Sequence, residues 1–193
     1  MKMMLFRSLI FLLVFTIAET RADPTQLVQA ARSQVGVTTS YDGSYVSLDY
    51  PNGDIPLETG VCTDVVVRAL RKTGHDLQKL VHEDMRAHFS KYPKIWGLRK
   101  PDKNIDHRRV PNLRTYFKRR SASLPLTKKK EDYHPGDFVT CTVAGKLPHI
   151  MIVSDKKAED GTPLVIHNIG GGAQEENSLF DFPLTGHYRF FKD

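Results

Sequence analysis

The 193-residue sequence has only two cysteines, Cys62 and Cys141, and no motif typical of cofactor binding. Two cysteines cannot stabilise a disulfide-rich mini-protein or supply a four-cysteine zinc or iron–sulfur site. No HExxH or CxxC pattern accompanies the eight histidines, and the glycines at 170–172 lack the GxGxxG or P-loop context that binds phosphates. We therefore expect neither a metal nor a cofactor.

Long apolar runs are also missing, except for one near the N-terminus, from Leu9 to Ala18. Its length of about ten residues is too short for a bilayer, which needs about 20. Two basic residues precede this run and Thr20-Arg21-Ala22 follows it, a pattern typical of a cleaved secretory signal peptide. We expect residues 1–22 to be that signal peptide, with a retained anchor as the alternative. The protein is then periplasmic or secreted, with no integral membrane span.

The net charge of +6 is unevenly distributed. Between Arg99 and Lys130, twelve lysines and arginines face only two aspartates, so the remaining chain is net acidic. This basic insert, at about 91–130, favours an anionic partner such as peptidoglycan or another anionic envelope polymer. We do not expect nucleic acid, because Tyr116 and Phe117 fit the core face of a helix better than a stacking platform. A solvated basic surface without a partner is the alternative.

Helical periodicity dominates the first part of the chain, and short apolar runs dominate the part after Pro135. Helices are predicted from Asp23-Pro24 to Gly36, from Thr59 or Gly60 to Lys72, from Asp76 to Pro93, and after a cap at Asn112. Strands are predicted at 138–143, 150–154, 164–168 and 188–191. This order predicts one α+β domain over 23–193, with N-terminal helices packed on a C-terminal antiparallel sheet.

Cys62 lies in the first turn of the second predicted helix. Free N–H groups and the helix dipole favour a thiolate there, and backbone amides can stabilise an oxyanion. Cys62 is therefore a candidate nucleophile. In an oxidising compartment a Cys62–Cys141 disulfide is the alternative. Alternation along residues 139–143 places Cys141 on the apolar face of its strand, where it can also serve as an unpaired core residue.

Two histidines are candidates for proton transfer to and from Cys62. His149 opens a predicted strand directly after Pro148, and His167 ends the next strand. Antiparallel pairing of these strands brings the two histidines together, so that one moves the proton while the other orients it. Asn168 is the alternative third residue, because alternation lets only one of His167 and Asn168 face the cleft.

The stretch Asp106-His107-Arg108-Arg109 is a candidate for substrate binding. Arginine guanidinium groups bind carboxylates and phosphates through two parallel hydrogen bonds, so Arg108 and Arg109 suit a substrate carboxylate near the cleft. Asp64, two residues after Cys62, is expected to shape the same pocket. An exposed charged loop is the alternative for residues 106–109.

Four motifs together carry a resemblance to a known family: Gly60-Val61-Cys62-Thr63-Asp64, residues 104–110, His134-Pro135-Gly136-Asp137-Phe138-Val139 and Leu147-Pro148-His149-Ile150. With them the chain resembles the DUF1287 family of exported bacterial proteins, which is similar to the NlpC/P60 branch of papain-like cysteine peptidases and amidases. In those enzymes a helix-start Cys, a Pro-Gly-Asp strand, a strand-start His and a polar third residue follow one another. Cys62, Pro135-Gly136-Asp137, His149 and His167 match that order. Gly60-Val61-Cys62-Thr63 departs from the usual Asp-Cys-Ser-Gly, and the basic insert is unusual.

The resemblance implies a papain-like fold and cleavage of peptidoglycan stem-peptide amides. Our main hypothesis is an exported cysteine amidase or endopeptidase with Cys62 as nucleophile, His149 as general base and His167 as its orienting partner. The sequence leaves open whether the acyl group passes to water or to another acceptor. The second hypothesis is a non-catalytic envelope protein that binds anionic polymer through the basic insert and contains a Cys62–Cys141 disulfide.

Overall fold

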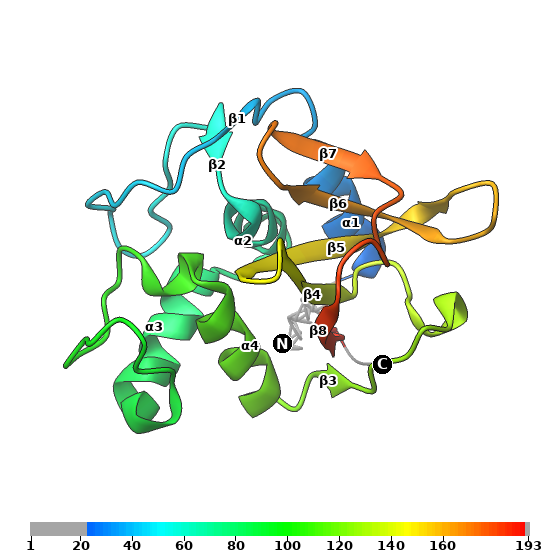
Figure 1. Ribbon diagram of the computed structural model, residues 1–193. Coiled ribbons are helices and arrows are strands. Elements are labelled where there is room, and N and C mark those ends of the chain that lie inside the picture. The colour runs from blue at the N-terminus through cyan, green and yellow to red at the C-terminus, as the bar shows by residue number, and fades with distance from the viewer. Residues whose placement is uncertain (1–22, 192–193) are drawn as a thin grey trace, which may run out of the picture.

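The structure is a computed structural model that describes residues 23–191, with helices packed on a six-stranded sheet (Figure 1). The helices are α1 (Pro24–Arg32), α2 (Cys62–Lys72), α3 (Leu77–His88) and α4 (Val110–Arg119), with short 3-10 helices η1 (Phe89–Lys91), η2 (Asp106–Arg108) and η3 (Lys130–Asp132). The strands are β1 (Ser40–Tyr41), β2 (Thr59–Gly60), β3 (Ser123–Leu124), β4 (Phe138–Val143), β5 (Leu147–Lys157), β6 (Pro163–Asn168), β7 (Ala173–Glu176) and β8 (Leu184–Tyr188). The predicted signal peptide lies outside the described residues.

The large sheet has the order β3-β8-β4-β5-β6-β7, and all its neighbouring strands are antiparallel. One face packs on the helices through side chains that include Phe138, Ile150, Ile152 and Ile166. The other face carries a smaller apolar cluster that includes Val139, Cys141, Met151, Val153 and Val165. The predicted α+β arrangement, with helices on one side of an antiparallel sheet, is confirmed. Within residues 23–191, no helix has the length and apolar character needed to cross a membrane.

Aspartate caps begin two of the helices, as the sequence predicts. The Asp23 carboxylate accepts a hydrogen bond from the Thr25 N–H at 2.8 Å, and the Asp76 carboxylate accepts one from the Gln78 N–H at 3.1 Å. Both bonds satisfy backbone donors that the first helical turn leaves free. Helix α2 begins at Cys62, later than predicted, because residues 59–60 pair with β1 as strand β2.

Several other predicted boundaries are wrong: α1 ends at Arg32 before Gly36, α3 ends at His88 before Pro93, and β5 is longer than the predicted 150–154. Helix α4 begins at Val110, and Asn112 is a buried residue inside it whose side chain donates to the Asp106 carbonyl. Pro111 at the second helical position explains the earlier start, since proline suits the first turn. The last strand is Leu184–Tyr188 instead of 188–191. Strands β3 and β7 were not predicted, because their short polar sequences become strands only by pairing with β8 and β6.

The basic insert is an integral part of the domain. Strand β3 forms one edge of the large sheet, and Phe117 of α4 stacks on Phe138 of β4 with ring centroids 5.1 Å apart. Several of its cations are held by neighbours within the fold: Arg108 pairs with Asp64, Arg109 with Asp106, Arg119 with Asp84, and Arg114 donates to the Thr185 carbonyl. The free positive charge is therefore smaller than the sequence count indicates.

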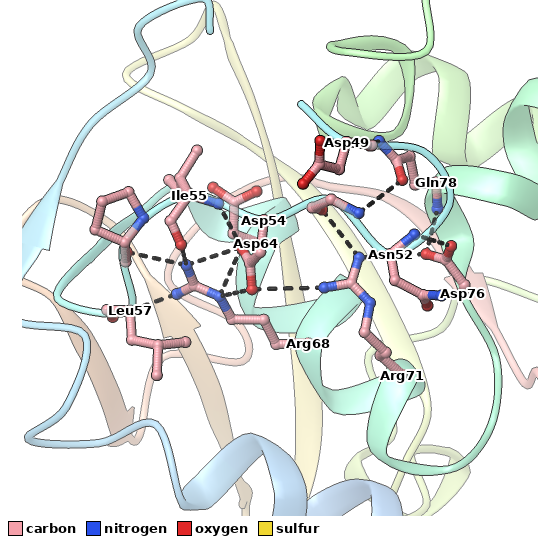
Figure 2. Close-up of polar contacts among 12 residues, drawn as sticks. Asp49, Asn52, Asp54, Ile55, Leu57, Asp64, Arg68, Arg71, Asp76 and Gln78 are labelled. Atoms are coloured by element: carbon pink, nitrogen blue, oxygen red, sulfur yellow. Dashed lines mark hydrogen bonds and ion pairs between the residues drawn. The ribbon is translucent and has the colours of Figure 1, made fainter. Parts of the chain in front are cut away.

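Two arginines of α2 hold the long connection between β1 and β2 (Figure 2). Arg68 is buried and donates to both oxygens of Asp54 and to the carbonyls of residues 55–57. Arg71 donates to the Gly53 carbonyl and to Asp76. The Gln78 side chain accepts from the Gly53 N–H and donates to the Asp49 carbonyl. These bonds fix the connection against α2 and α3, close to the start of α2.

Replacing Phe117 tests whether the basic insert is part of the core. Phe117 is fully buried, so Phe117→Ala should lower the free energy of unfolding by about 3–5 kcal/mol. The neighbouring exposed residue supplies the control, and Lys118→Ala should change it by less than about 0.5 kcal/mol. Urea denaturation of residues 23–193 measures both. Equal, small effects would show that the insert is a peripheral addition.

Candidate functional site

Cys62 is the first residue of α2 and is 3% exposed. Its sulfur accepts backbone hydrogen bonds from Ile150 on β5 and from Thr63, which lower the thiol pKa. Burial is the larger effect, and it raises the pKa of Cys62 to about 12. The low pKa expected at a helix N-terminus is therefore reversed in this resting structure, because removal from water disfavours the thiolate more than the helix start favours it.

Cys141 lies in the apolar cluster on the opposite face of the sheet from α2, as the strand alternation predicts. Both cysteines are free and buried, so the Cys62–Cys141 disulfide of the second hypothesis is wrong for this structure. The sheet stands between the two clusters that contain them. Cys141 is thus a core residue, and burial raises the pKa of its thiol to about 12.

A chain of hydrogen bonds runs from His149 through His167 to Glu176. Nε2 of His149 lies 2.8 Å from Nδ1 of His167, and Nε2 of His167 lies 2.8 Å from a carboxylate oxygen of Glu176. Both imidazoles are buried, whereas the Glu176 side chain is 40% exposed. Burial, with repulsion from His167, lowers the pKa of His149 to about 3, so the ring is neutral near pH 7.

Glu176 was not identified from the sequence. It ends β7, whose residues Ala173-Gln174-Glu175-Glu176 lack the β-branched and aromatic side chains that predict a strand. Antiparallel pairing of β7 with β6 places Glu176 diagonally from His167 on the same face.

Cys62 and His149 lie near the same point of β5 but on opposite faces of the sheet. His149 pairs directly with Cys141 across β4 and β5, so its side chain leaves the strand on the face away from α2. Cys62 contacts the next residue, Ile150, from the helix side. Within residues 23–191, no hydrogen bond joins the Cys62 sulfur to His149. The structure thus brings His149 and His167 together. Cys62 contacts β5 at Ile150, the residue that follows His149.

Asn168 has a different task from His167. Its side-chain amide donates to the Gly60 carbonyl at 2.9 Å and to the Ser40 carbonyl at 3.1 Å. Its oxygen accepts from the N–H groups of Gly170 and Gly172. Asn168 therefore holds β1 and β2 against the end of β6. Strand β2 ends at Gly60, two residues before Cys62. Of the two alternatives for the third residue, His167 is the one that contacts His149.

Asp64 and Arg108 form a buried ion pair with each other. The Arg108 guanidinium donates to both Asp64 oxygens, at 2.9 and 3.0 Å, and also to the carbonyls of Asp42 and Ser44. Asp64 in turn accepts from the Val61 N–H at 2.7 Å. Both side chains are at most 5% exposed. Their hydrogen-bonding capacity is used inside the protein, which makes them supports of the pocket wall.

The expectation of an exposed charged loop at 106–109 is wrong. Asp106, His107 and Arg108 are buried in the 3-10 helix η2. Burial and the nearby Arg108 lower the pKa of His107 to about 4. Arg109 is partly exposed, donates to Asp106 at 3.2 Å, and places its guanidinium 4.2 Å from the centroid of the Trp96 ring. It is the predicted substrate-binding residue with the most accessible cation.

An open pocket of about 520 Å³ lies beside Cys62. Its wall includes Tyr41, Tyr45, Trp96, Arg109 and Pro148. The three aromatic side chains were not identified from the sequence, because they come from irregular segments without periodicity. Within residues 23–191, no group of three or more His, Cys, Asp or Glu side chains is arranged to hold a metal ion. The pocket is thus an aromatic-walled cavity lined by two arginines, Arg108 and Arg109, and one thiol.

The buried neutral histidines predict acid sensitivity. The pKa values of His107 and His149 fall from 6.5 to about 4 and about 3 on folding. Below pH 6.5 the unfolded chain binds protons that the folded chain does not, so stability is greatest above that pH and falls toward pH 4. Each histidine should contribute a slope of about 1.4 kcal/mol per pH unit.

Urea denaturation between pH 7.5 and 4.5 measures this slope. His149→Gln should make it shallower by about one proton, whereas the exposed control His134→Gln should leave it unchanged. The same slope in both variants would contradict a neutral, buried His149.

Comparisons with known proteins place the chain in a family. Residues 28–190 match the family model described as "Domain of unknown function (DUF1287)". The Escherichia coli (strain K12) protein YijF is 56% identical over 165 residues, which cover 86% of this chain and 80% of that protein. Among solved structures, NlpC1 from Trichomonas vaginalis superimposes with a TM-score of 0.47 and 11% identity, over 91% of this chain. This chain covers 47% of that structure, about half its length. The chain belongs to the DUF1287 family.

Proposed function

We propose that this protein is an exported cysteine hydrolase, an amidase or endopeptidase that cleaves peptide amide bonds of peptidoglycan. The observation that carries the proposal is the hydrogen-bonded chain Glu176–His167–His149, which ends one residue from the point where β5 contacts Cys62. A buried imidazole held by a second imidazole and a carboxylate is the arrangement that orients a general base. The order of the sequence motifs, which resembles that of NlpC/P60 enzymes, supports the choice of substrate.

In this mechanism the Cys62 sulfur attacks the amide carbonyl carbon, and its proton passes to His149. Nε2 of His149 is engaged by His167, so Nδ1 is the nitrogen that receives the proton. His149 then gives that proton to the leaving amine as the carbon–nitrogen bond breaks, which leaves a thioester on Cys62. Water attacks the thioester with His149 as base, releasing the carboxylic acid and restoring the thiol.

The electrostatics of the site favour a neutral resting pair. The raised pKa of Cys62 and the lowered pKa of His149 keep both the thiol and the imidazole uncharged near pH 7. The proton therefore leaves sulfur as the new bond forms, which is general-base catalysis rather than attack by a preformed thiolate. This step needs Nδ1 of His149 within hydrogen-bond distance of the sulfur. The two side chains lie on opposite faces of the sheet in this structure, so the mechanism requires the start of β5 to rearrange when substrate binds.

Peptidoglycan digestion tests the proposed function. Cys62→Ala should abolish fragment release, and His149→Ala should reduce its rate by about 10²–10⁴-fold, the usual contribution of a general base. Cys141→Ala is the matched control for loss of a thiol and should retain fragment release, because Cys141 lies on the other face of the sheet from Cys62 and its small, apolar replacement leaves the neighbouring His149 in place. Mass spectrometry of the soluble fragments identifies the bond that is cleaved.

Identical fragment profiles from the wild type and Cys62→Ala would refute the proposed substrate. Products extended by an added amine, in place of free carboxylic acids, would assign the protein to acyl transfer with the same residues.

Export is a separate part of the proposal. Expression of the full chain in a bacterial host should yield a mature protein in the periplasm or the medium that begins near Asp23, as the predicted signal peptide requires. Mass spectrometry of the intact protein determines the N-terminus. A cell-associated product that retains residues 1–22 would contradict cleavage.

A further inference from the structure

A second open pocket, of about 800 Å³, is formed by residues 97–103 together with His82 of α3. We call it the 97–103 pocket. The proposed mechanism uses none of its side chains. Its wall carries the cations Arg99, Lys100 and Lys103 and one carboxylate, Asp102. With three cations it has more than any other pocket described for residues 23–191, although its net charge equals that of the Cys62 pocket, which Arg108 and Arg109 line.

The cations of this pocket lack ion-pair partners within residues 23–191, as do other exposed cations of the insert such as Lys118 and Arg120, but Arg99, Lys100 and Lys103 line a pocket together. Arg108, Arg109 and Arg119 each lie within ion-pair distance of an aspartate. Within residues 23–191, no such pair involves Arg99 or Lys100, and both are exposed. The carboxylate of Asp102 is engaged elsewhere, because it accepts from the Tyr45 hydroxyl at 3.0 Å and from the Asn104 N–H at 2.9 Å.

His82 adds a polar atom without a partner. Its Nδ1 is buried and has no hydrogen bond in the described part of the chain. The ring packs edge-on against Tyr50 at a centroid distance of 5.2 Å, and Lys103 lies over the same tyrosine ring. A buried nitrogen without a partner is costly, but this atom is closed to solvent, so the cations of the pocket are the groups available to a ligand.

One segment separates this pocket from the pocket at Cys62. Ile95, Trp96 and Ile105 line the Cys62 pocket, and the residues between them, 97–103, line the second. The Tyr45 hydroxyl, on the wall of the first pocket, is bonded to Asp102 on the wall of the second. An extended ligand that crosses this segment reaches both pockets.

We propose that the 97–103 pocket binds an oxyanion group, a phosphate or a carboxylate, carried by the same envelope polymer whose amide bond lies at Cys62. Arg99 and Lys100 supply the charge that binds this group, with Lys103 beside them on the pocket wall. The link to an amide at Cys62 rests on the proposed function, whereas oxyanion binding does not.

Tryptophan fluorescence provides a direct binding assay, because Trp96 is the only tryptophan and adjoins the pocket. Residues 23–193 are titrated with pyrophosphate and, in a second arm, with succinate, which identifies the preferred oxyanion. Arg99→Gln/Lys100→Gln should weaken binding at least tenfold. The matched control Lys118→Gln/Arg120→Gln removes the same charge from exposed residues of the insert outside the pocket, and should change binding less than twofold.

Cys62→Ala should bind the oxyanion like the wild type, so a failure of the hydrolase proposal does not affect this result. If peptidoglycan is the substrate, Arg99→Gln/Lys100→Gln should raise KM and leave kcat unchanged. Equal weakening by the two double variants would overturn the proposal in favour of a diffuse charge effect, as would no response to either oxyanion. Tighter binding of a single-stranded oligonucleotide than of soluble peptidoglycan fragments, lost in Arg99→Gln/Lys100→Gln, would overturn the assignment to an envelope polymer.

Discussion

The Asp64 carboxylate is the contact on which the site depends. It accepts the Val61 N–H, which sets the start of α2 and hence the position of Cys62. It also accepts hydrogen bonds from Nε and Nη2 of Arg108, whose guanidinium further donates to the carbonyls of Asp42 and Ser44. One buried charge therefore joins three segments that are distant in the sequence. Such a pair adds little net stability compared with apolar packing. Separating its partners would leave an unpaired charge buried, which is costly, so the pair holds the three segments in one arrangement.

Burial, more than charge, determines the chemistry available at Cys62 and His149. A helix start and two backbone hydrogen bonds favour the thiolate, yet removal from water outweighs them. The same effect keeps His149 neutral, and the carboxylate of Glu176 acts on it only through His167. In the proposed mechanism the proton therefore stays on the Cys62 sulfur until a substrate brings the thiol and His149 together. The order of events in the proposed mechanism follows from that constraint.

The basic insert shows how tertiary structure changes the meaning of a charge count. Twelve cations in one stretch indicate a uniform basic surface. In the fold, Arg108 and Arg119 bind aspartates of α2 and α3, and Phe117 enters the core beside β4. The unpaired charge that remains includes the pair Arg99 and Lys100 at a single pocket. The sequence could not show which cations are paired, because the aspartate partners of Arg108 and Arg119 lie 35 or more residues away along the chain.

Local sequence signals were enough to predict several features of the fold: the helix starts at Asp23 and Asp76, the strands β4 and β6, and the proximity of His149 and His167. They succeeded because capping and strand alternation act over a few residues. Tertiary structure alone decided the roles of Asp64 and Glu176, the boundaries of β7 and β8, and the protonation of Cys62. Each of these depends on partners distant in the sequence or on removal from water. At Cys62, burial reverses the thiolate preference that its position at the start of a helix predicts, because removal from water disfavours the charged form.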